Sequence, residues 1–315
     1  MQIVRDRKNI PSSAKGGVVV IGNFDGVHRG HQAVIGQAAD LAEAVKAPLV
    51  VLTFEPHPRS YFRPDDTPFR LTPFQNKAHH LEALDVDVLV ALDFGAELAG
   101  MEAEDFVRQI LVAGLDAAHV VVGYDFCFGK GRTGTPDKLR EWGGFPVTTI
   151  SPVASADEEV YSSTRIRDYL RTGRPGLAAA LLGRPFEIEG EVNTGRQLGR
   201  TIGFPTANVG LDDYLRPLYG VYAVRLGLEQ ADGHVGWYDA IANLGNRPTV
   251  DGVQEQLEVH IFDFDQDLYS QVVRVALIEF IRPEQKFDGL DALKAQIEED
   301  CHVARRILHT RAAGA

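Results

Sequence analysis

The stretch 17-GVVVIGNFDGVHRGHQ-32 decides the fold of the first half of this 315-residue chain. Residues 17–22 hold four aliphatic residues between two glycines, which predicts a buried strand. The glycine-rich loop leads into residues 31–46, which predict a helix because their apolar residues recur at helical spacing. Those residues are Val34, Ile35, Ala38, Leu41 and Val45. A strand that passes through a short loop into a helix is typical of the opening unit of an α/β fold.

Strands and helices continue to alternate through the first half. Further strands are predicted at 48–54, 86–92, 119–124 and 146–153, and further helices at 77–84 and 103–111. This alternation predicts a mostly parallel sheet with helices on both faces.

The second half has a different pattern. Short strand-like runs separated by turn residues occur at 187–193, 220–228, 236–245, 256–264 and 271–281. Such spacing predicts an antiparallel barrel or sandwich, and a helix from Leu290 to His309 closes the chain. Gly-Arg-Pro triplets begin at 173 and 183 and bracket a short apolar helix, so we place the boundary between domains 1–184 and 185–315.

Composition excludes several classes of protein. Lys plus Arg number 32 and Asp plus Glu number 44, a net charge of −12, which disfavours a broad nucleic-acid interface. No apolar run approaches the about 20 residues of a membrane helix, and no signal peptide is evident. Two distant cysteines, Cys127 and Cys301, offer neither a disulfide framework nor a zinc site. We therefore expect a cytoplasmic protein without nucleic-acid or membrane partners.

His28 and His31 flank Arg29 and Gly30 where the loop enters the first helix. A helix N-terminus offers free N–H groups and a partial positive charge, which favour phosphate. Imidazoles at that point can donate hydrogen bonds to phosphoryl oxygens. Asp25 either caps the turn or orients a histidine. The alternative is a glycine-rich loop with surface histidines, which the strand–loop–helix context makes the weaker interpretation.

This segment resembles the HxGH motif of nucleotidyltransferases, and 22-GNFDGVHRGH-31 resembles, more narrowly, the bifunctional bacterial riboflavin kinase/FAD synthetase family. The resemblance implies a Rossmann-like N-terminal domain that transfers AMP from ATP to FMN and releases pyrophosphate. It implies that His28 and His31 are catalytic. It places Gly22, Asn23, Phe24, Asp25 and Gly26 at the ATP phosphates.

The segment 161-YSSTRIRDYL-170 resembles the SSTxIR motif of the same family. Ser162, Ser163 and Thr164 are good helix N-cap residues. The resemblance implies that these three residues and Arg167 bind phosphate. A capped helix with solvated arginines is the alternative.

Two further segments resemble the flavin-binding parts of the family, 54-FEPHP-58 and 123-GYDFCFGKGRTG-134. The implied flavin-binding residues are His57, Asp125, Phe126 and Phe128. In an extended segment the two phenylalanines share one face and could cover an isoalloxazine or a purine ring. Core packing of one phenylalanine and a purely structural His57 are the alternatives.

The segment 195-GRQLGRTIGFPTANV-209 resembles riboflavin kinases. Gly195, Gly199 and Gly203 suit a loop over phosphates. Thr206 and Asn208 lie two residues apart, so in a strand they project to the same face. Their hard oxygens suit Mg²⁺, which shares the phosphates of ATP, and the resemblance implies that role.

Phosphoryl transfer to an alcohol also needs an acceptor for the hydroxyl proton. Glu258, in 256-QLEVHIFDFD-265, stands where the family has its catalytic glutamate. The loop with Asn243 and Arg247 is expected to support the site. The terminal segment 281-IRPEQKFDGL-290 also resembles the family, which implies that Arg282 covers the flavin.

Residues 15–300 carry the resemblance, with the motifs of both halves in order. We therefore expect an enzyme that converts riboflavin to FMN and FMN to FAD, with ATP as co-substrate and Mg²⁺ as cofactor. Its partners are then riboflavin, FMN and ATP, and its oligomeric state is not given by the sequence. Two alternatives are an adenylyl- or cytidylyltransferase acting on another phosphate ester, and a flavin-binding sensor without turnover.

Overall fold

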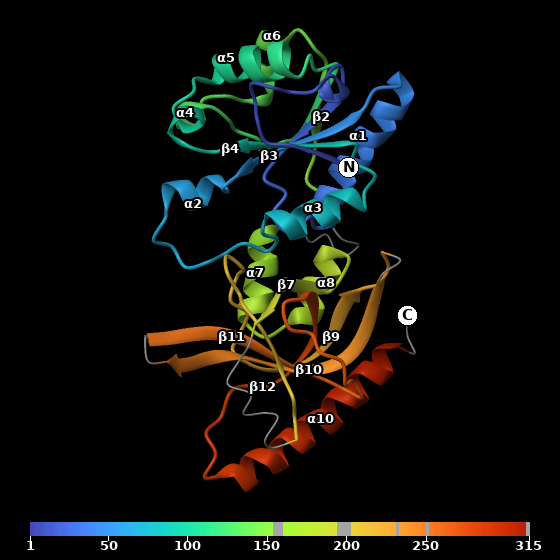
Figure 1. The fold of residues 1–315 in the computed structure, drawn as a ribbon. Coiled ribbons are helices and arrows are strands. Elements are labelled where there is room, and N and C mark those ends of the chain that lie inside the picture. Colours follow the sequence, from blue (N-terminus) through green and yellow to red (C-terminus); the bar gives the residue numbers. More distant parts are fainter. Residues whose placement is uncertain (154–159, 194–202, 231–232, 250–251, 313–315) are drawn as a thin grey trace. The chain divides into compact units, whose positions relative to one another are not determined.

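A computed structural model describes residues 1–153, 160–193, 203–230, 233–249 and 252–312 (Figure 1). The chain forms two compact units, Met1–Thr67 with Thr72–Ser162, and Pro68–Leu71 with Ser163–Ala315. Helices α7 (Ser163–Arg171) and α8 (Pro175–Leu182) belong to the second unit. The functional boundary at residue 184 stays a prediction.

The first unit is built on a six-stranded sheet, and the predicted parallel sheet is confirmed. Its strands are β1 (Gln2–Val4), β2 (Val18–Ile21), β3 (Leu49–Glu55), β4 (Val88–Asp93), β5 (His119–Gly123) and β6 (Val147–Ile150). They lie in the order β1-β4-β3-β2-β5-β6 with every neighbouring pair parallel. After β2 the chain builds one side of the sheet through β3 and β4 and then the other through β5 and β6. In α/β sheets, ligands bind at the carboxyl ends of the strands beside such a switch of direction.

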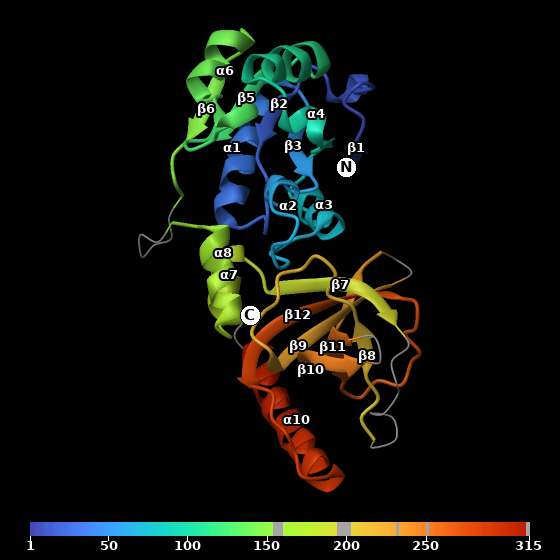
Figure 2. The same cartoon turned by 90° about the vertical axis from the view of Figure 1, so that its left-hand side faces the viewer.

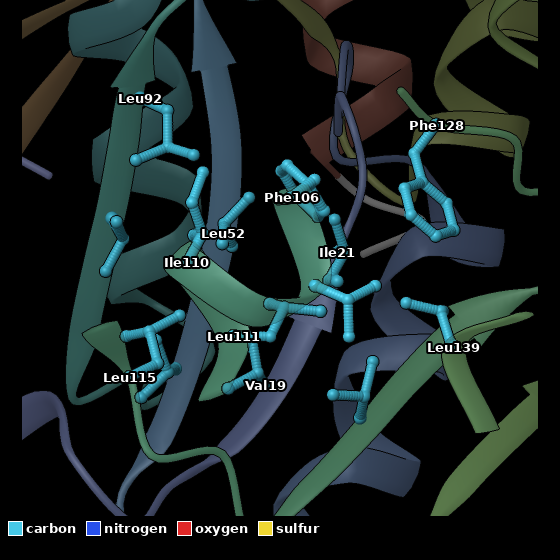
Figure 3. Packing of buried hydrophobic residues seen from close by; sticks show 14 of the residues in the cluster. Val19, Ile21, Leu52, Leu92, Phe106, Ile110, Leu111, Leu115, Phe128 and Leu139 are labelled. Carbon is cyan, nitrogen blue, oxygen red and sulfur yellow. The ribbon is translucent and has the colours of Figure 1, made fainter. Parts of the chain in front are cut away.

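Helices cover both faces of the sheet (Figures 1 and 2). The helices of this unit are α1 (Arg29–Val45), α2 (Pro58–Phe62), α3 (Phe74–Glu82), α4 (Ala96–Ala99), α5 (Ala103–Asp105), a π-helix (Phe106–Gly114) and α6 (Pro136–Gly143). Figure 3 shows side chains of the π-helix lying against β2, β3 and β4. A second apolar cluster on the other face includes Ile35 and Ala38 of α1.

One expectation for α1 is wrong. Val45 was expected on its apolar face but is 59% exposed, whereas Ala42 is buried. Val45 is the last residue of the helix, and Lys46 follows in the left-handed conformation (φ 56°), so the chain turns away there.

The second unit is a closed antiparallel barrel, which settles the choice between barrel and sandwich. Its strands are β7 (Phe186–Asn193), β8 (Ala207–Val209), β9 (Gly220–Glu229), β10 (Val235–Thr249), β11 (Gly252–Ile261) and β12 (Val272–Arg282). Around the barrel the order is β10-β11-β8-β7-β12-β9.

The predicted terminal helix is α10 (Leu290–Ala312), which starts at the expected residue. Its fully buried Ala304 and Leu308 pack against Val221, Ala223 and Ile241 of the barrel. No helix within the described residues combines the length and the apolar character needed to cross a membrane.

Candidate active sites

The loop between β2 and α1 is tightly folded and buried. Phe24 (φ 48°), Gly26 (φ 92°) and Val27 (φ 41°) all have left-handed backbone conformations. Phe24, Asp25 and Val27 are 3%, 2% and 1% exposed. The surroundings of this loop, at the carboxyl end of β2, therefore hold its backbone in place.

The two imidazoles meet at the first turn of α1. His28 is the N-cap of the helix, and its Nδ1 accepts the N–H of His31 at 3.3 Å. The two rings stack with centroids 3.6 Å apart and planes 16° from parallel. Because Nδ1 of His28 accepts, the neutral ring carries its proton on Nε2, which is then a donor. A Cβ on Gly30 would lie 3.1 Å from both His28 Cε1 and Tyr161 Cβ, so glycine permits this close packing.

The loop is anchored to the rest of its unit by hydrogen bonds. Asp25 Oδ1 accepts the N–H of Thr72 at 3.1 Å, and Thr72 Oγ1 accepts the N–H of Gly26 at 2.8 Å. Thr53 Oγ1 donates to the carbonyl of Asn23 at 3.3 Å. Of the two roles expected for Asp25, these contacts match the one that fixes the turn.

The residues predicted to bind flavin differ in their surroundings. Phe126 and Phe128 stack with centroids 5.5 Å apart, so they do share one side. Phe128 is only 6% exposed and packs on Phe106 in the core shown in Figure 3, whereas Phe126 is half-buried and Asp125 is exposed. His57 is the N-cap of α2, and its Nδ1 accepts the N–H of Arg59 at 3.0 Å. The geometry thus matches the core-packing alternative for Phe128, and the flavin role of all four residues stays a prediction.

An aromatic cluster that the sequence analysis missed lies at the carboxyl ends of β3 and β4. Tyr61, Phe62 and Phe94 make mutual edge-to-face contacts with centroids 5.2 to 5.8 Å apart. Phe62 is 65% exposed, and Phe94 also contacts the buried Phe54. Tyr61 and Phe62 come from the short α2 and Phe94 follows β4, so no sequence spacing links them. They offer an apolar surface for a planar ring.

The SSTRIR segment crosses the border between the two units. Ser162 ends the first unit, and Ser163 and Thr164 begin α7 in the second. Arg167 Nε donates to the carbonyl of Phe69 at 2.9 Å, and its guanidinium lies 5.4 Å from the Phe69 ring. Arg167 therefore binds the segment around Phe69, which belongs to the same unit. The phosphate role of the SSTRIR residues stays a prediction.

In the barrel, a row of polar residues crosses four strands. Asn193 of β7 is opposite Asn208 of β8, Asn208 is opposite Glu258 of β11, and Glu258 is opposite Asn243 of β10. Directly opposed residues project to the same face of a sheet. Leu257, next to Glu258, is fully buried in the barrel, so the polar row faces away from the barrel interior.

Asn208 is the one member of this row that is buried, with 4% exposure. Its Oδ1 has no hydrogen-bond partner among the described residues. A buried carbonyl oxygen without a partner is costly unless a ligand supplies one. Within the described chain no group of three or more His, Cys, Asp or Glu side chains could hold a metal ion. Amide and hydroxyl oxygens such as those of Asn208 and Thr206 are nevertheless suitable partial ligands for Mg²⁺, which keeps several waters and shares phosphate oxygens.

The segment before β8 borders a cavity of about 80 Å³. Its walls include Pro205, Thr206, Phe264 and Tyr269. His260, two residues beyond Glu258, donates from Nδ1 to the carbonyl of Pro205 at 2.8 Å, which fixes the backbone just before Thr206. Gly203 is exposed with φ 92°, and Gly195 and Gly199 lie outside the described residues.

Arg282 lies at the end of β12 and is bound within its own unit. Its Nε and Nη2 donate to both carboxylate oxygens of Asp300 in α10 at 2.6 to 3.0 Å. The guanidinium also lies 5.7 Å from the ring of Phe287. The structure therefore shows Arg282 joining β12 to α10, and its contact with flavin stays a prediction.

Comparisons with known proteins match both halves of the chain. The family model for FAD synthetase matches residues 10–165, and the family model for riboflavin kinase matches residues 182–308. A curated relative from Haemophilus influenzae, "Bifunctional riboflavin kinase/FMN adenylyltransferase", is 39% identical over 98% of this chain and all of its own length. A protein of the same name from Escherichia coli K12 is 41% identical over 97% of each chain. This chain belongs to the bifunctional riboflavin kinase/FMN adenylyltransferase family.

A solved structure also matches this family member over most of its length. The crystal structure named "Macrolide-efflux Protein" from Streptococcus pneumoniae has a TM-score of 0.84 and 33% identity. The match covers 96% of this chain and 98% of the other. The name of that protein differs from those of the curated relatives, but its fold is that of the present chain.

The geometry sorts the predicted residues of the bifunctional family into two groups. His28 and His31 come together with the 22–26 loop in the first unit, and Asn208 and Glu258 are opposed in register in the second. Thr206 immediately precedes β8 and is half-buried beside them. The sequence analysis missed Thr72, which tertiary packing brings to Asp25 from 47 positions along the chain.

Proposed function

We propose that this chain phosphorylates riboflavin to FMN and adenylylates FMN to FAD, with ATP as the donor in both reactions. The proposal rests chiefly on one observation. A single chain carries a stacked imidazole pair at a helix N-terminus in one unit and an opposed Asn208–Glu258 pair in the other. The family to which the chain belongs supports the same pair of reactions.

In the adenylyltransferase unit, an oxygen of the FMN phosphate attacks the α-phosphorus of ATP. The bond between that phosphorus and the oxygen leading to the β-phosphate breaks, and pyrophosphate leaves. His28 Nε2, the second imidazole of His31 and the N–H groups at the start of α1 stabilise the negative charge on the phosphates. The nucleophile is already an anion, so the step needs no protein base.

The flavin of the adenylyltransferase unit needs an apolar surface near the carboxyl ends of the strands. The exposed ring of Phe62, supported by Tyr61 and Phe94, provides one at the carboxyl ends of β3 and β4. Phe126 contributes a half-buried ring. We assign the isoalloxazine to these surfaces, and Phe128 supports Phe126 from the core.

In the kinase unit, the 5′-hydroxyl of riboflavin attacks the γ-phosphorus of ATP, and ADP leaves. Glu258 accepts the hydroxyl proton. Thr206 Oγ1 and Asn208 Oδ1 would hold Mg²⁺, which neutralises phosphate charge when it is bound. Glu258 is directly opposite Asn208 in register, which supports assigning the proton acceptor and a metal ligand to this pair.

We further propose a reducing compartment such as the cytoplasm. Both cysteines, Cys127 and Cys301, are free thiols in the structure.

The test is chromatography of a reaction of purified protein with riboflavin, ATP and magnesium. FMN should appear first and FAD second. Glu258→Gln should reduce FMN formation at least about 100-fold while FAD still forms from supplied FMN. The double replacement of His28 and His31 by Ala should have the opposite effect. Absence of both products from the wild-type reaction would refute the proposal, and loss of both activities in either variant would refute the division between units.

A further inference from the structure

The loop that carries the adenylyltransferase motif has a backbone conformation that depends on contacts with the rest of its unit. Phe24 and Val27 are non-glycine residues in the left-handed region, with φ 48° and 41°. A β-branched residue such as Val27 adopts this conformation only where surrounding contacts impose it. The residues that impose it are therefore part of how the site is built.

Thr72 holds this loop through two hydrogen bonds in opposite directions. Its N–H donates to Asp25 Oδ1 at 3.1 Å, and its Oγ1 accepts the N–H of Gly26 at 2.8 Å. Asp25 and Thr72 are each 2% exposed, so water does not compete with either bond. Gly26 itself has φ 92°, and its N–H lies two residues before His28.

A second set of contacts reaches the loop from the helix that follows Thr72. Lys77 of α3 is fully buried, and its Nζ lies 3.4 Å from Thr53 Oγ1 and 4.0 Å from Glu55 Oε2. Thr53 Oγ1 in turn donates to the carbonyl of Asn23 at 3.3 Å. Residues 72–77 thus contact the loop at Gly26 directly and at Asn23 through Thr53.

We propose that Thr72 is a positioning residue for adenylyl transfer, and that Lys77 acts with it through Thr53. They fix the backbone of residues 23–26, which sets where His28 begins α1 and where its Nε2 meets the phosphates. A small displacement of a group that acts on the reacting atoms can lower the reaction rate strongly. This inference rests on the proposed function of the first unit and adds residues that do not themselves touch substrate.

Thr72→Val tests the proposal with little change of volume. It removes the acceptor for the N–H of Gly26 and keeps the backbone N–H that Asp25 binds. We expect kcat/KM for FAD formation from FMN to fall about 10- to 30-fold, about 1.4 to 2 kcal/mol. FMN formation from riboflavin by the same preparation should stay within twofold. Thr72→Ser keeps the hydroxyl and should restore FAD formation to within threefold of the wild type.

Two controls separate positioning from loss of fold. Thr310→Val removes an exposed hydroxyl that donates to a backbone carbonyl of α10, and it should leave both reactions unchanged. Hydrogen exchange followed by mass spectrometry should show faster exchange in Thr72→Val at the peptide containing Gly26, with strands β3 and β4 unchanged. Thr53→Val, which breaks the second route, should also lower FAD formation selectively.

Several results would overturn the inference. One is that Thr72→Val forms FAD as fast as the wild type. Another is that Thr72→Val and Thr72→Ser lose FAD formation equally. A third is unfolding of the whole unit, seen as faster exchange throughout its sheet. The wild-type reaction distinguishes this failure from failure of the proposed function, because only the latter removes FAD formation from the unaltered protein.

Discussion

Asp300→Leu is the perturbation that best separates a structural role from a flavin-binding role of Arg282. Asp300 is 3% exposed and accepts three hydrogen bonds from Arg282, at 2.6, 2.9 and 3.0 Å. Gln296 adds a fourth bond at 2.9 Å. The pair joins the end of β12 to the middle of α10, whose Ala304 and Leu308 complete an apolar cluster on the barrel.

The expected cost follows from the burial of the pair. Removing one partner of a fully buried ion pair costs about 3–5 kcal/mol, because the other charge remains without compensation. The Arg282 side chain is 18% exposed, so water recovers part of this loss. We therefore expect Asp300→Leu to lower the free energy of unfolding of the second unit by about 2–3 kcal/mol. For a unit of this size that corresponds to a fall of about 5–10 °C in Tm.

The assay is a double-mutant cycle measured by urea unfolding and by kinase kinetics. Arg282→Met, Asp300→Leu and the double variant should show a coupling free energy of at least about 1 kcal/mol. The KM for riboflavin should change equally in both single variants if Arg282 acts only by joining β12 to α10. A loss below about 0.5 kcal/mol in Asp300→Leu would refute the structural argument. A KM that rises only in Arg282→Met would instead support the flavin contact predicted from the sequence.

Three further outcomes are expected. His260→Phe removes the donor to the carbonyl of Pro205. It should raise the KM for ATP of the kinase about five- to tenfold, which corresponds to the loss of one hydrogen bond. FAD formation from FMN should not change and serves as the control. Gly129→Ala should lower the free energy of unfolding of the first unit by at least about 2 kcal/mol, since φ is 70° and a Cβ would lie 2.5 Å from the backbone of α5. Gly131→Ala, with φ 64° but only an ordinary contact of 3.9 Å to Thr133 Cγ2, should cost only about 1 kcal/mol by the same thermal measurement. Burial raises the pKa of the Cys301 thiol to about 11, so less of the thiol is ionised at pH 8. The higher pKa makes the remaining thiolate more nucleophilic, which offsets part of that loss, and iodoacetamide should react roughly ten times slower than with an unperturbed cysteine. Equal rates by mass spectrometry would contradict this.

The sequence predicted those parts of the fold whose causes are local. Periodicity located five strands of the parallel sheet and the helices near 31–46, 77–84 and 103–111, because these runs carry a local apolar pattern. It missed α2, α4 and α6, which are eight residues long or shorter. β1 was missed, since a three-residue strand has no period to detect; it is fixed instead by pairing with β4. Val45 was misplaced because helical spacing does not show where a helix leaves the sheet.

The residues of the active sites also divide into those paired by local spacing and those brought together by tertiary structure. His28 and His31 could be paired from the sequence because both belong to one helix turn. The pairing of Thr206 with Asn208, which lie two residues apart, stays a prediction. The opposition of Asn208 and Glu258 required the barrel register, which joins residues 50 positions apart. Thr72 and the Tyr61–Phe62–Phe94 cluster required tertiary packing, and no local spacing of residues contains that information.

The difference between the two sites follows from the protonation state of the two nucleophiles. Riboflavin attacks through a neutral hydroxyl, so its site must include a proton acceptor, and Glu258 lies opposite the buried amide of Asn208. FMN attacks through a phosphate that is already ionised near neutral pH, so its site needs donors for the developing charge rather than a base. We propose that the stacked imidazoles and the start of α1 supply such donors, while Asp25, the nearby carboxylate, has an oxygen committed to the N–H of Thr72. The proposed reactions therefore need different groups at the two sites, because one nucleophile is a neutral hydroxyl and the other is a phosphate anion.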